Sequence, residues 1–263
     1  MRIGLLNIMP EAEKYEDLIF KLLLHQAVDV EIVLIRAKNH AYKSSDKLHL
    51  EKHYVSFDQA VEKQQLHGLI LTGAPVEFVA FEDITYWNEL TEILNYAREN
   101  IISTMGICWG SIAIGKFLGI DNTIIEDKLF GVFRAKFLKH AHWIAGDGNV
   151  EFECPQSRYA GLDETQLINA EKQGKINLLA ASTTAGHFIF ESSDESFLAH
   201  LGHPEYDIHR IMMEYERDKL KGLNLIPENF NVTNPINSWQ QYSSALFANW
   251  LKRIEQKCNL KTE

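Results

Sequence analysis

Short apolar runs alternate with amphipathic stretches through the first half of the chain. The apolar runs are rich in Ile, Leu and Val, which is typical of strands buried on both faces of a sheet. These expected strands are residues 3–8, 28–35, 68–72 and 101–108. The amphipathic stretches repeat apolar residues at helical spacing, and the expected helices are residues 15–26, 57–64, 82–99 and 111–118. This alternation predicts an α/β fold with an open, mostly parallel sheet and helices on both faces.

The second half of the chain is less regular and adds further strands. We expect these late strands at 128–133, 150–154, 176–181, 187–190 and 197–201, and helices at 203–220 and 243–257. Residues 222–238 are rich in Asn and Pro and are expected to form a loop. The polar residues 38–54 are also expected to be a surface loop, because their histidines lack the fixed spacing of metal ligands. No repeat or linker divides the chain, so residues 1–263 are expected to form a single α/β domain.

Composition and charge argue against several functions. The 263 residues carry a net charge of -10 and a pI of about 5.6, whereas nucleic-acid binding needs a basic face. The 3 cysteines are too few for a disulfide framework and fit a reducing compartment. The chain begins directly in an expected strand, with no apolar leader and no run long enough to span a membrane. We therefore expect a cytoplasmic protein with no nucleic-acid and no membrane partner.

A candidate nucleophile lies between a strand and a helix, in Gly106-Ile-Cys108-Trp-Gly110. Such a turn strains the backbone of the nucleophile, and flanking glycines leave room for the close approach that it requires. The N-terminus of the following helix would stabilise a thiolate. A buried cysteine at a strand end has the same local pattern, so the motif alone leaves catalysis open. Cys154, before Pro155 at an expected strand exit, and Cys258, at the end of the last helix, are expected to be structural.

A base for this thiol is expected in Leu201-Gly-His-Pro-Glu-Tyr-Asp207. Pro204 biases His203 towards an extended conformation, in which residues two apart face the same side. Glu205 can therefore converge on His203 and orient the imidazole. Asp207 is placed to cap the following helix. The alternative is an exposed histidine in an ordinary strand-to-helix loop.

The turn Thr72-Gly-Ala-Pro75 ends another expected strand. In open α/β sheets, ligands bind at the edge where the carboxyl ends of the parallel strands meet. Thr72-Gly73 and Cys108 are therefore expected to share one crevice.

Further motifs occur together in a fixed order. They are Thr72-Gly-Ala-Pro75, Tyr86-Trp87, Lys128-Leu-Phe-Gly-Val132, Ser157-Arg-Tyr159, Gly202-His-Pro-Glu-Tyr-Asp207, Glu214-Tyr-x-Arg-Asp218 and Phe247-x-Asn-Trp-Leu251. A Cys-His-Glu set on an open α/β sheet resembles the class I glutamine amidotransferase-like superfamily. Within it, these motifs resemble the homoserine O-acyltransferases of methionine biosynthesis, and the resemblance spans nearly the whole chain.

The resemblance implies acyl transfer by a ping-pong mechanism. Cys108 would take the acyl group from acyl-CoA as a thioester, and His203, supported by Glu205, would deprotonate the acceptor hydroxyl. The oxyanion would lie against the backbone N–H groups of Trp109 and of the Gly73-Ala74 turn. The implied substrate contacts, which suit the carboxylate of an amino acid, are Lys128, Ser157 and Arg217. We expect acetyl-CoA and a hydroxy amino acid as substrates, with no metal and no other cofactor.

Glu77 bears on the choice of acyl donor. Its position holds a small residue in relatives that use succinyl-CoA, and relatives with Glu there look like acetyl-CoA users. A carboxylate at this point would fill space and repel the terminal carboxylate of a succinyl group. We therefore expect acetyl-CoA rather than succinyl-CoA, the alternative being a surface glutamate on a turn.

The expected acceptor is homoserine, with serine, one methylene shorter, as the alternative. The chain departs from the family in three ways that bear on the acceptor pocket and on an oligomer interface. Ile112 and Tyr242 replace a Gln and a His, and the N-terminal arm of a few dozen residues common in the family is absent. A homodimer is compatible with the sequence. Two other classes of function are a glutaminase, which would need a synthase partner, and a silent binding module, which an intact Cys-His-Glu set disfavours.

Overall fold

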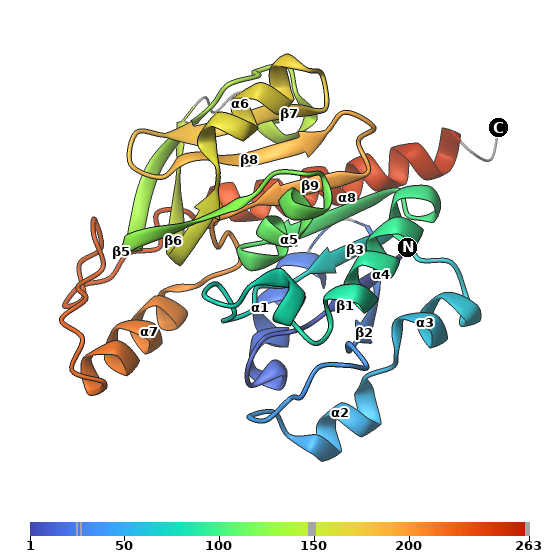
Figure 1. Ribbon diagram of the computed structural model, residues 1–263, viewed down its shortest axis with the longest axis horizontal. Helices are drawn as coiled ribbons and strands as arrows, with labels where there is room; N and C mark the ends of the chain where they lie inside the picture. The colour runs from blue at the N-terminus through green and yellow to red at the C-terminus, as the bar shows by residue number, and fades with distance from the viewer. Residues whose placement is uncertain (25, 27, 147–150, 261–263) are drawn as a thin grey trace.

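One nine-stranded sheet runs through the molecule (Figure 1). The computed structural model describes residues 1–24, 26, 28–146 and 151–260. The strands are β1 Arg2–Leu6, β2 Glu31–Ile35, β3 Gly68–Leu71, β4 Ser103–Ile107, β5 Asn122–Phe137, β6 Glu151–Leu162, β7 Ile176–Ser182, β8 Gly186–Ser192 and β9 Phe197–His200. They lie in the order β2-β1-β3-β4-β9-β8-β7-β5-β6. Pairs from β2 to β9 are parallel and pairs from β9 to β6 antiparallel, which confirms the expected open sheet with additional late strands.

Helices cover both faces of the sheet, as expected. They are α1 Ala12–Leu24, α2 Lys47–His53, α3 Phe57–Lys63, α4 Trp87–Asn100, α5 Trp109–Phe117, α6 Glu164–Lys172, α7 Ile208–Leu220 and α8 Gln240–Leu260, with short 3₁₀ turns η1 Phe81–Asp83 and η2 Trp143–Ala145. On one face, Trp250 of α8 donates its indole N–H to the hydroxyl of Ser103 in β4, at 2.9 Å. Successive residues of a strand face opposite sides of the sheet, and Gly106 comes three residues after Ser103 in β4. Gly106 therefore faces the other side of the sheet. There α5 approaches so closely that a Cβ on Gly106 would lie 2.7 Å from the backbone of Gly110.

Residues 47–53 form a helix, α2, so the expectation of a loop over 38–54 is wrong there. Asp46 caps α2 by accepting hydrogen bonds from two backbone N–H groups of the first turn. Leu50 alone among the residues of α2 is buried, and one apolar position gives no helical periodicity. Helix α6 is not predicted either, because it buries only two residues.

The hairpin of β5 and β6 is longer than expected. The predicted strand 128–133 is the middle of β5, and the predicted strand 150–154 is the start of β6, with Val150 outside the described residues. Cys154 and Pro155 lie inside β6 rather than at its exit, so that expectation is wrong. Because β6 is an edge strand, a residue without a backbone N–H can be accommodated there.

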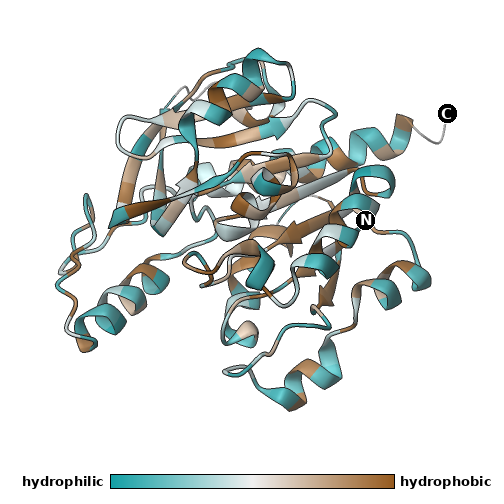
Figure 2. Ribbon diagram, in the orientation of Figure 1, coloured by the Kyte–Doolittle hydropathy of each residue, from teal (hydrophilic) through white to brown (hydrophobic). Residues whose placement is uncertain are grey.

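The last two helices follow the prediction more closely. The predicted helix 203–220 begins at Ile208, because Asp207 caps it by accepting a hydrogen bond from the Arg210 N–H at 2.9 Å. The stripe expected on α8 is buried, namely Leu246, Phe247, Trp250, Leu251 and Ile254. Figure 2 shows the central strands as largely apolar and the outer helices as mixed. None of the helices in the described part of the chain is both long and apolar enough to cross a membrane.

Candidate active site

Cys108 occupies the turn between β4 and α5, as predicted. Its backbone has φ 51° and ψ -114°, a left-handed conformation that residues other than glycine rarely adopt. Gly110 is required in this turn, because a Cβ there would lie 2.3 Å from the carbonyl oxygen of Leu71. The turn leaves the thiol half-buried at the carboxyl edge of the parallel strands.

Ser111 ties this turn to β9. Its hydroxyl donates to the carbonyl oxygen of Gly106 at 2.7 Å and accepts from the N–H of His200 at 2.7 Å. The backbone N–H of Cys108 in turn donates to the carbonyl oxygen of His200 at 2.9 Å. These bonds fix the nucleophile relative to the strand that leads into His203.

His203 and Glu205 converge as predicted. Nδ1 of His203 lies 2.7 Å from Oε1 of Glu205, and both side chains are buried. Since the carboxylate engages Nδ1, Nε2 remains as the nitrogen available to Cys108. The backbone N–H of His203 donates to the carbonyl oxygen of Pro155 at 2.8 Å, and the ring of Tyr206 stacks on the imidazole with centroids 4.0 Å apart. The imidazole is thereby held on two sides.

The environment of His203 favours its protonated form. Burial opposes the charge, but the charges of Cys108 and Glu205, together with hydrogen bonds to both, raise the pKa of His203 to about 10. A thiolate and an imidazolium side by side form the arrangement that cysteine nucleophiles use.

A cleft with a volume of about 590 Å³ opens over Cys108. Gly73, Ala74 and Trp109 line it, which confirms that the turn after β3 and the nucleophile share one crevice. A Cβ on Gly73 would lie 3.5 Å from Cβ of Cys108, so this backbone passes directly beside the nucleophile. Trp109 begins α5, where helical N–H groups have no partner within the helix. Within the described residues, no group of three or more His, Cys, Asp or Glu side chains could hold a metal ion.

Lys128 lies in the same cleft, but its ammonium group is already paired. The side chain is 4% exposed, and Nζ lies 2.7 Å from Asp218 Oδ2 and 3.6 Å from Glu214 Oε2. Lys128 therefore fixes two carboxylates of α7 instead of presenting an unpaired cation to the cleft.

Glu214 is the carboxylate most firmly held in the cleft. The hydroxyl of Tyr206 donates to Oε1 at 2.6 Å, and the hydroxyl of Ser157 donates to Oε2. Burial favours the neutral acid, but nearby cations, with Lys128 the strongest, lower the pKa of Glu214 to about 2. In the sequence, Glu214 appears only as part of a motif. Its place in the site could not be predicted, because it depends on contacts with residues that are distant in the chain.

Arg217 extends from α7 along the same cleft with 46% of its side chain exposed. Its Nε and Nη2 both lie 2.8 Å from Oδ1 of Asp218. Within the described residues, the third guanidinium nitrogen, Nη1, has no hydrogen bond or ion pair.

Arg158 also lines the cleft, 6% exposed, and is not among the predicted site residues. Among the described residues, its guanidinium donates only to uncharged oxygens: the side chain of Gln156 at 2.9 Å and the carbonyl groups of Ala160 at 2.8 Å and Ala185 at 3.0 Å. Burial lowers the pKa of Arg158 to about 10. Arg158 belongs to the motif Ser157-Arg-Tyr159, but the sequence alone does not show that its guanidinium is buried and hydrogen-bonded to uncharged oxygens.

Glu77 lines the cleft and is half-buried. In the described part of the chain, no side chain forms an ion pair or hydrogen bond with its carboxylate. The neighbouring Phe78 packs its ring against Tyr159 at 5.5 Å, and burial together with Asp218 and Glu77 raises the pKa of Tyr159. A carboxylate without such a partner among the described residues thus lines the cleft.

The two substituted family positions have different surroundings. Ile112 lines the cleft, whereas Tyr242 does not. The hydroxyl of Tyr242 is hydrogen-bonded to Nε2 of His200 at 2.7 Å, and its ring stacks on Phe152 at 3.9 Å. The predicted influence of Tyr242 on the acceptor, or on an oligomer interface, stays a prediction.

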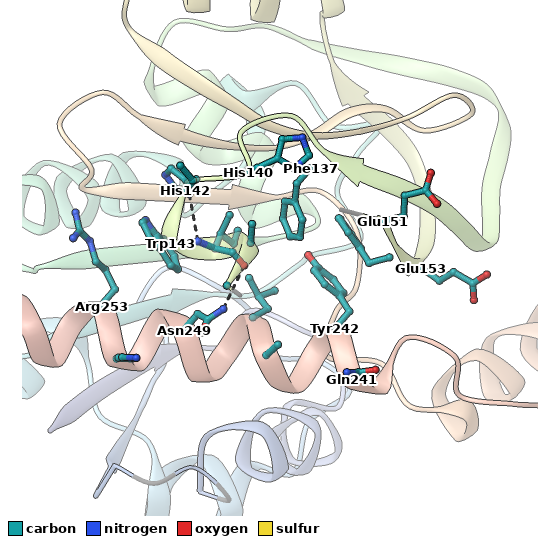
Figure 3. Close-up of a pocket in the computed structure, with 18 of the residues that line it drawn as sticks. Phe137, His140, His142, Trp143, Glu151, Glu153, Gln241, Tyr242, Asn249 and Arg253 are labelled. Atoms are coloured by element: carbon teal, nitrogen blue, oxygen red, sulfur yellow. Dashed lines mark hydrogen bonds between the residues drawn. The ribbon is translucent and has the colours of Figure 1, made fainter. Parts of the chain in front are cut away.

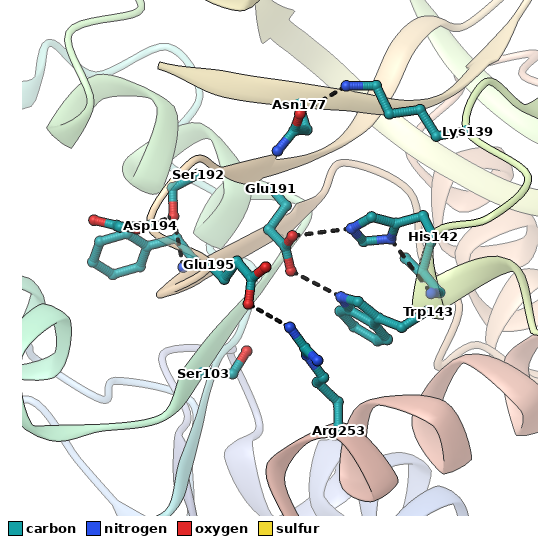
Figure 4. Close-up of polar contacts among 12 residues, drawn as sticks. Ser103, Lys139, His142, Trp143, Asn177, Glu191, Ser192, Asp194, Glu195 and Arg253 are labelled. Atoms are coloured by element: carbon teal, nitrogen blue, oxygen red, sulfur yellow. Dashed lines mark hydrogen bonds and ion pairs between the residues drawn. The ribbon is translucent and has the colours of Figure 1, made fainter. Parts of the chain in front are cut away.

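A larger cavity, of about 930 Å³, lies between α8 and the η2 segment (Figure 3). Figure 4 shows what holds this segment in place: the buried carboxylate of Glu191 accepts from the ring of His142 at 3.0 Å and from the indole of Trp143 at 3.1 Å. This cavity contains neither Cys108 nor His203. We assign the active site to the smaller cleft, because that cleft contains the nucleophile and its base.

Comparison with known proteins points to one family. The family model described as homoserine O-succinyltransferase matches residues 1–260. The homoserine O-acetyltransferase of Clostridium botulinum (strain Eklund 17B / Type B) is 38% identical over 266 residues, covering 95% of this chain and 83% of that protein. The homoserine O-acetyltransferase of Geobacillus sp. (strain WCH70) is 36% identical over 259 residues, covering 95% and 84%.

Solved structures share the fold at low sequence identity. A glutamine amidotransferase from Thermotoga maritima superposes with a TM-score of 0.63 at 14% identity, covering 97% of this chain and 98% of that one. A putative GMP synthase component from Thermoplasma acidophilum gives a TM-score of 0.63 at 17% identity, covering 100% and 98%. Identity this low shows the fold alone, and it confirms the predicted relation to the glutamine amidotransferase-like fold.

Proposed function

The chain belongs to the homoserine O-succinyltransferase family, and from that premise we propose that it transfers an acetyl group from acetyl-CoA to the hydroxyl of homoserine. Homoserine O-acyltransfer in methionine biosynthesis is the activity that the family and the named relatives support. The acetyl donor and the thioester intermediate are our more specific proposal. The observation that carries it is the strained Cys108 in the same cleft as His203, Glu214 and Arg217.

In the first half-reaction, the thiolate of Cys108 attacks the carbonyl carbon of acetyl-CoA. The negative oxygen of the tetrahedral intermediate lies against the N–H groups of Trp109 and of the Gly73-Ala74 turn. The carbon–sulfur bond to CoA breaks, and His203 gives its proton to the departing thiolate. The products are the acetyl-thioester on Cys108, free CoA and a neutral imidazole.

In the second half-reaction, His203 acts as the base. Once Cys108 is acetylated, the thiolate charge that contributes most to raising the pKa of His203 is gone, while burial still opposes protonation. His203 then loses its proton more readily, and its neutral form accepts the hydroxyl proton of homoserine. The alkoxide attacks the thioester carbonyl, the acetyl ester of homoserine leaves, and the thiolate–imidazolium pair is restored.

The charged groups of α7 suit the two ends of an amino acid. The ionised Glu214 would accept the ammonium group, and Nη1 of Arg217 would donate to the carboxylate. Ser157 and Lys128 act through Glu214: the hydroxyl of Ser157 donates to its Oε2, and the ammonium group of Lys128 forms an ion pair with the same oxygen. The ion pairs of Lys128 add a role in fixing these acids to its predicted contact with the substrate, which stays a prediction.

Acyl transfer by purified protein tests this proposal directly. Acetyl-CoA and succinyl-CoA should each be offered with homoserine and with serine, and acetyl-CoA with homoserine should give the highest kcat/KM. Incubation with acetyl-CoA alone should add one acetyl mass to the peptide that contains Cys108. Acetyl label on another residue would contradict the mechanism, and steady ammonia release from glutamine would favour a glutaminase.

A further inference from the structure

A tyrosine from the start of the chain binds the carboxylate that orients the base. The hydroxyl of Tyr15, on α1, lies 2.8 Å from Oε1 of Glu205, 190 residues further along. The same oxygen lies 2.7 Å from Nδ1 of His203. The other oxygen, Oε2, is buried and has no hydrogen-bond partner in the part of the chain that the structure describes. Both of these bonds fall on one oxygen of a carboxylate whose side chain is 0% exposed.

The direction of the bond from Tyr15 is fixed by its environment. Burial, followed by the charge of Glu205, raises the pKa of Tyr15 well above its ordinary value. The phenol thus keeps its proton and donates to Glu205. Within the described residues, it is the one hydrogen-bond donor that reaches this carboxylate from outside the turn containing His203.

We infer that Tyr15 is a positioning residue for the acyl-transfer reaction, acting through Glu205 on His203. Without the phenol, the buried carboxylate of Glu205 would keep a single hydrogen bond, and buried polar groups are costly when poorly satisfied. The Tyr15 bond also fixes the rotation of the carboxylate, so that Oε1 points at Nδ1 and Nε2 stays aimed at Cys108. This inference rests on the proposed function, because the imidazole that it orients is the proposed base.

Tyr15 is separable from the packing of α1. The first turn of α1 is anchored by other groups: the N–H of Ala12 donates to Ser45 Oγ at 3.0 Å, and the side chain of Asn7 donates to the Ala12 carbonyl at 3.0 Å. Replacement of Tyr15 by Phe removes the donor and keeps the buried ring. We therefore expect the helix to stay in place in Tyr15→Phe.

The chain offers a matched control. Tyr54 is buried like Tyr15, and its hydroxyl donates to a buried glutamate of the same helix, Glu16 Oε1, at 2.7 Å. Tyr54→Phe thus removes the same kind of hydrogen bond to the same helix, together with one that the hydroxyl accepts from Nδ2 of Asn7 at 2.9 Å, and Tyr54 does not line the cleft. If Tyr15 only stabilises the fold, the two variants should behave alike.

The test compares Tyr15→Phe and Tyr54→Phe in steady-state acetyl transfer to homoserine. Tyr15→Phe should lower kcat by about ten- to a hundredfold, as expected for the loss of one hydrogen bond to a charged group, with KM for homoserine changed less than about twofold. Tyr54→Phe should leave both constants within about twofold. Similar falls in Tm for the two variants, with only Tyr15→Phe losing kcat, would support positioning; an unchanged kcat in Tyr15→Phe, or equal losses in both variants, would overturn it.

A second measurement does not depend on the substrate. The hydrogen-bonded Nδ1–H proton of His203 should give a low-field ¹H NMR resonance that disappears in Glu205→Gln. That resonance should shift in Tyr15→Phe and stay in place in Tyr54→Phe. If no acyl transfer is found with any substrate, the proposed function fails while this shift still tests Tyr15; if transfer is found and the resonance does not move, the positioning role fails alone.

Discussion

Removal of the negative charge on Cys108 should lower the pKa of His203 and so make its imidazole easier to deprotonate. The charge of Cys108 is the largest of the contributions that raise the pKa of His203 to about 10. Alkylation with iodoacetamide makes the sulfur neutral, as acetylation does, without exchanging the residue. In a Cys258→Ser background, the half-buried Cys108 is the thiol exposed to reagent, because Cys154 is fully buried.

The expected size of the effect follows from the shift itself. A rise from 6.5 to about 10 corresponds to about 5 kcal/mol in favour of the imidazolium. Burial opposes this preference, so Cys108 and Glu205 together supply more than that amount. One opposite charge in contact is worth about one to three pKa units, and alkylation should therefore lower the pKa of His203 by about two units.

Histidine-selective ¹⁵N NMR measures this change. The chain has 11 histidines, so the resonance of His203 should be assigned as the one missing from His203→Gln. Glu205→Gln, which removes the other raising charge, should also lower the pKa of His203. His67 serves as a control, because its pKa is lowered mainly by burial and its ring accepts a hydrogen bond from the backbone N–H of Arg2. Its pKa should not change on alkylation of Cys108. The reasoning is refuted if His203 titrates at the same pH before and after alkylation.

Three further predictions concern transfer itself. Cys108→Ala and His203→Ala should each lower kcat by several orders of magnitude, and the double variant should lose little more, because the two residues act as one unit. Glu77→Gly should raise kcat/KM for succinyl-CoA relative to that for acetyl-CoA by about a hundredfold, because it removes a carboxylate that would repel the terminal carboxylate of the succinyl group. A wild type that already prefers succinyl-CoA would contradict this. Arg217→Met should raise KM for homoserine by about ten- to a hundredfold and leave the single-turnover acetylation of Cys108 unchanged.

The parts of the site that sequence could predict are those with a local cause. The turn at Cys108 needs glycines on either side, and the convergence of His203 and Glu205 follows from an extended chain held by Pro204. The crevice shared by Gly73 and Cys108 follows from parallel strands meeting at one edge. Each of these inferences needs only a few neighbouring residues or the order of the strands.

The parts that could not be predicted depend on pairs far apart in the chain. Lys128 is expected from its motif to contact substrate, and only the position of α7 against β5 reveals that Asp218 and Glu214 already engage its ammonium group. Tyr15 gives no sign of a role in the sequence, because its partner Glu205 lies in a distant segment. Short helices escape prediction for a different reason: α2 buries one side chain and so has no apolar periodicity.

The contacts of Tyr206 argue for homoserine over serine. Its ring stacks on His203 with centroids 4.0 Å apart, and its hydroxyl donates to Glu214 at 2.6 Å. Glu214, which we propose holds the ammonium group, is therefore linked through Tyr206 to His203, which takes the hydroxyl proton. An acceptor anchored at Glu214 must have the right length for its hydroxyl to reach His203, and it cannot slide without losing the anchor. A chain one methylene too short displaces the hydroxyl by about 1 Å or more, and a misplacement of that size can cost about a hundredfold in rate. Serine carries the same ammonium and carboxylate groups as homoserine, so it should bind in this cleft but react slowly.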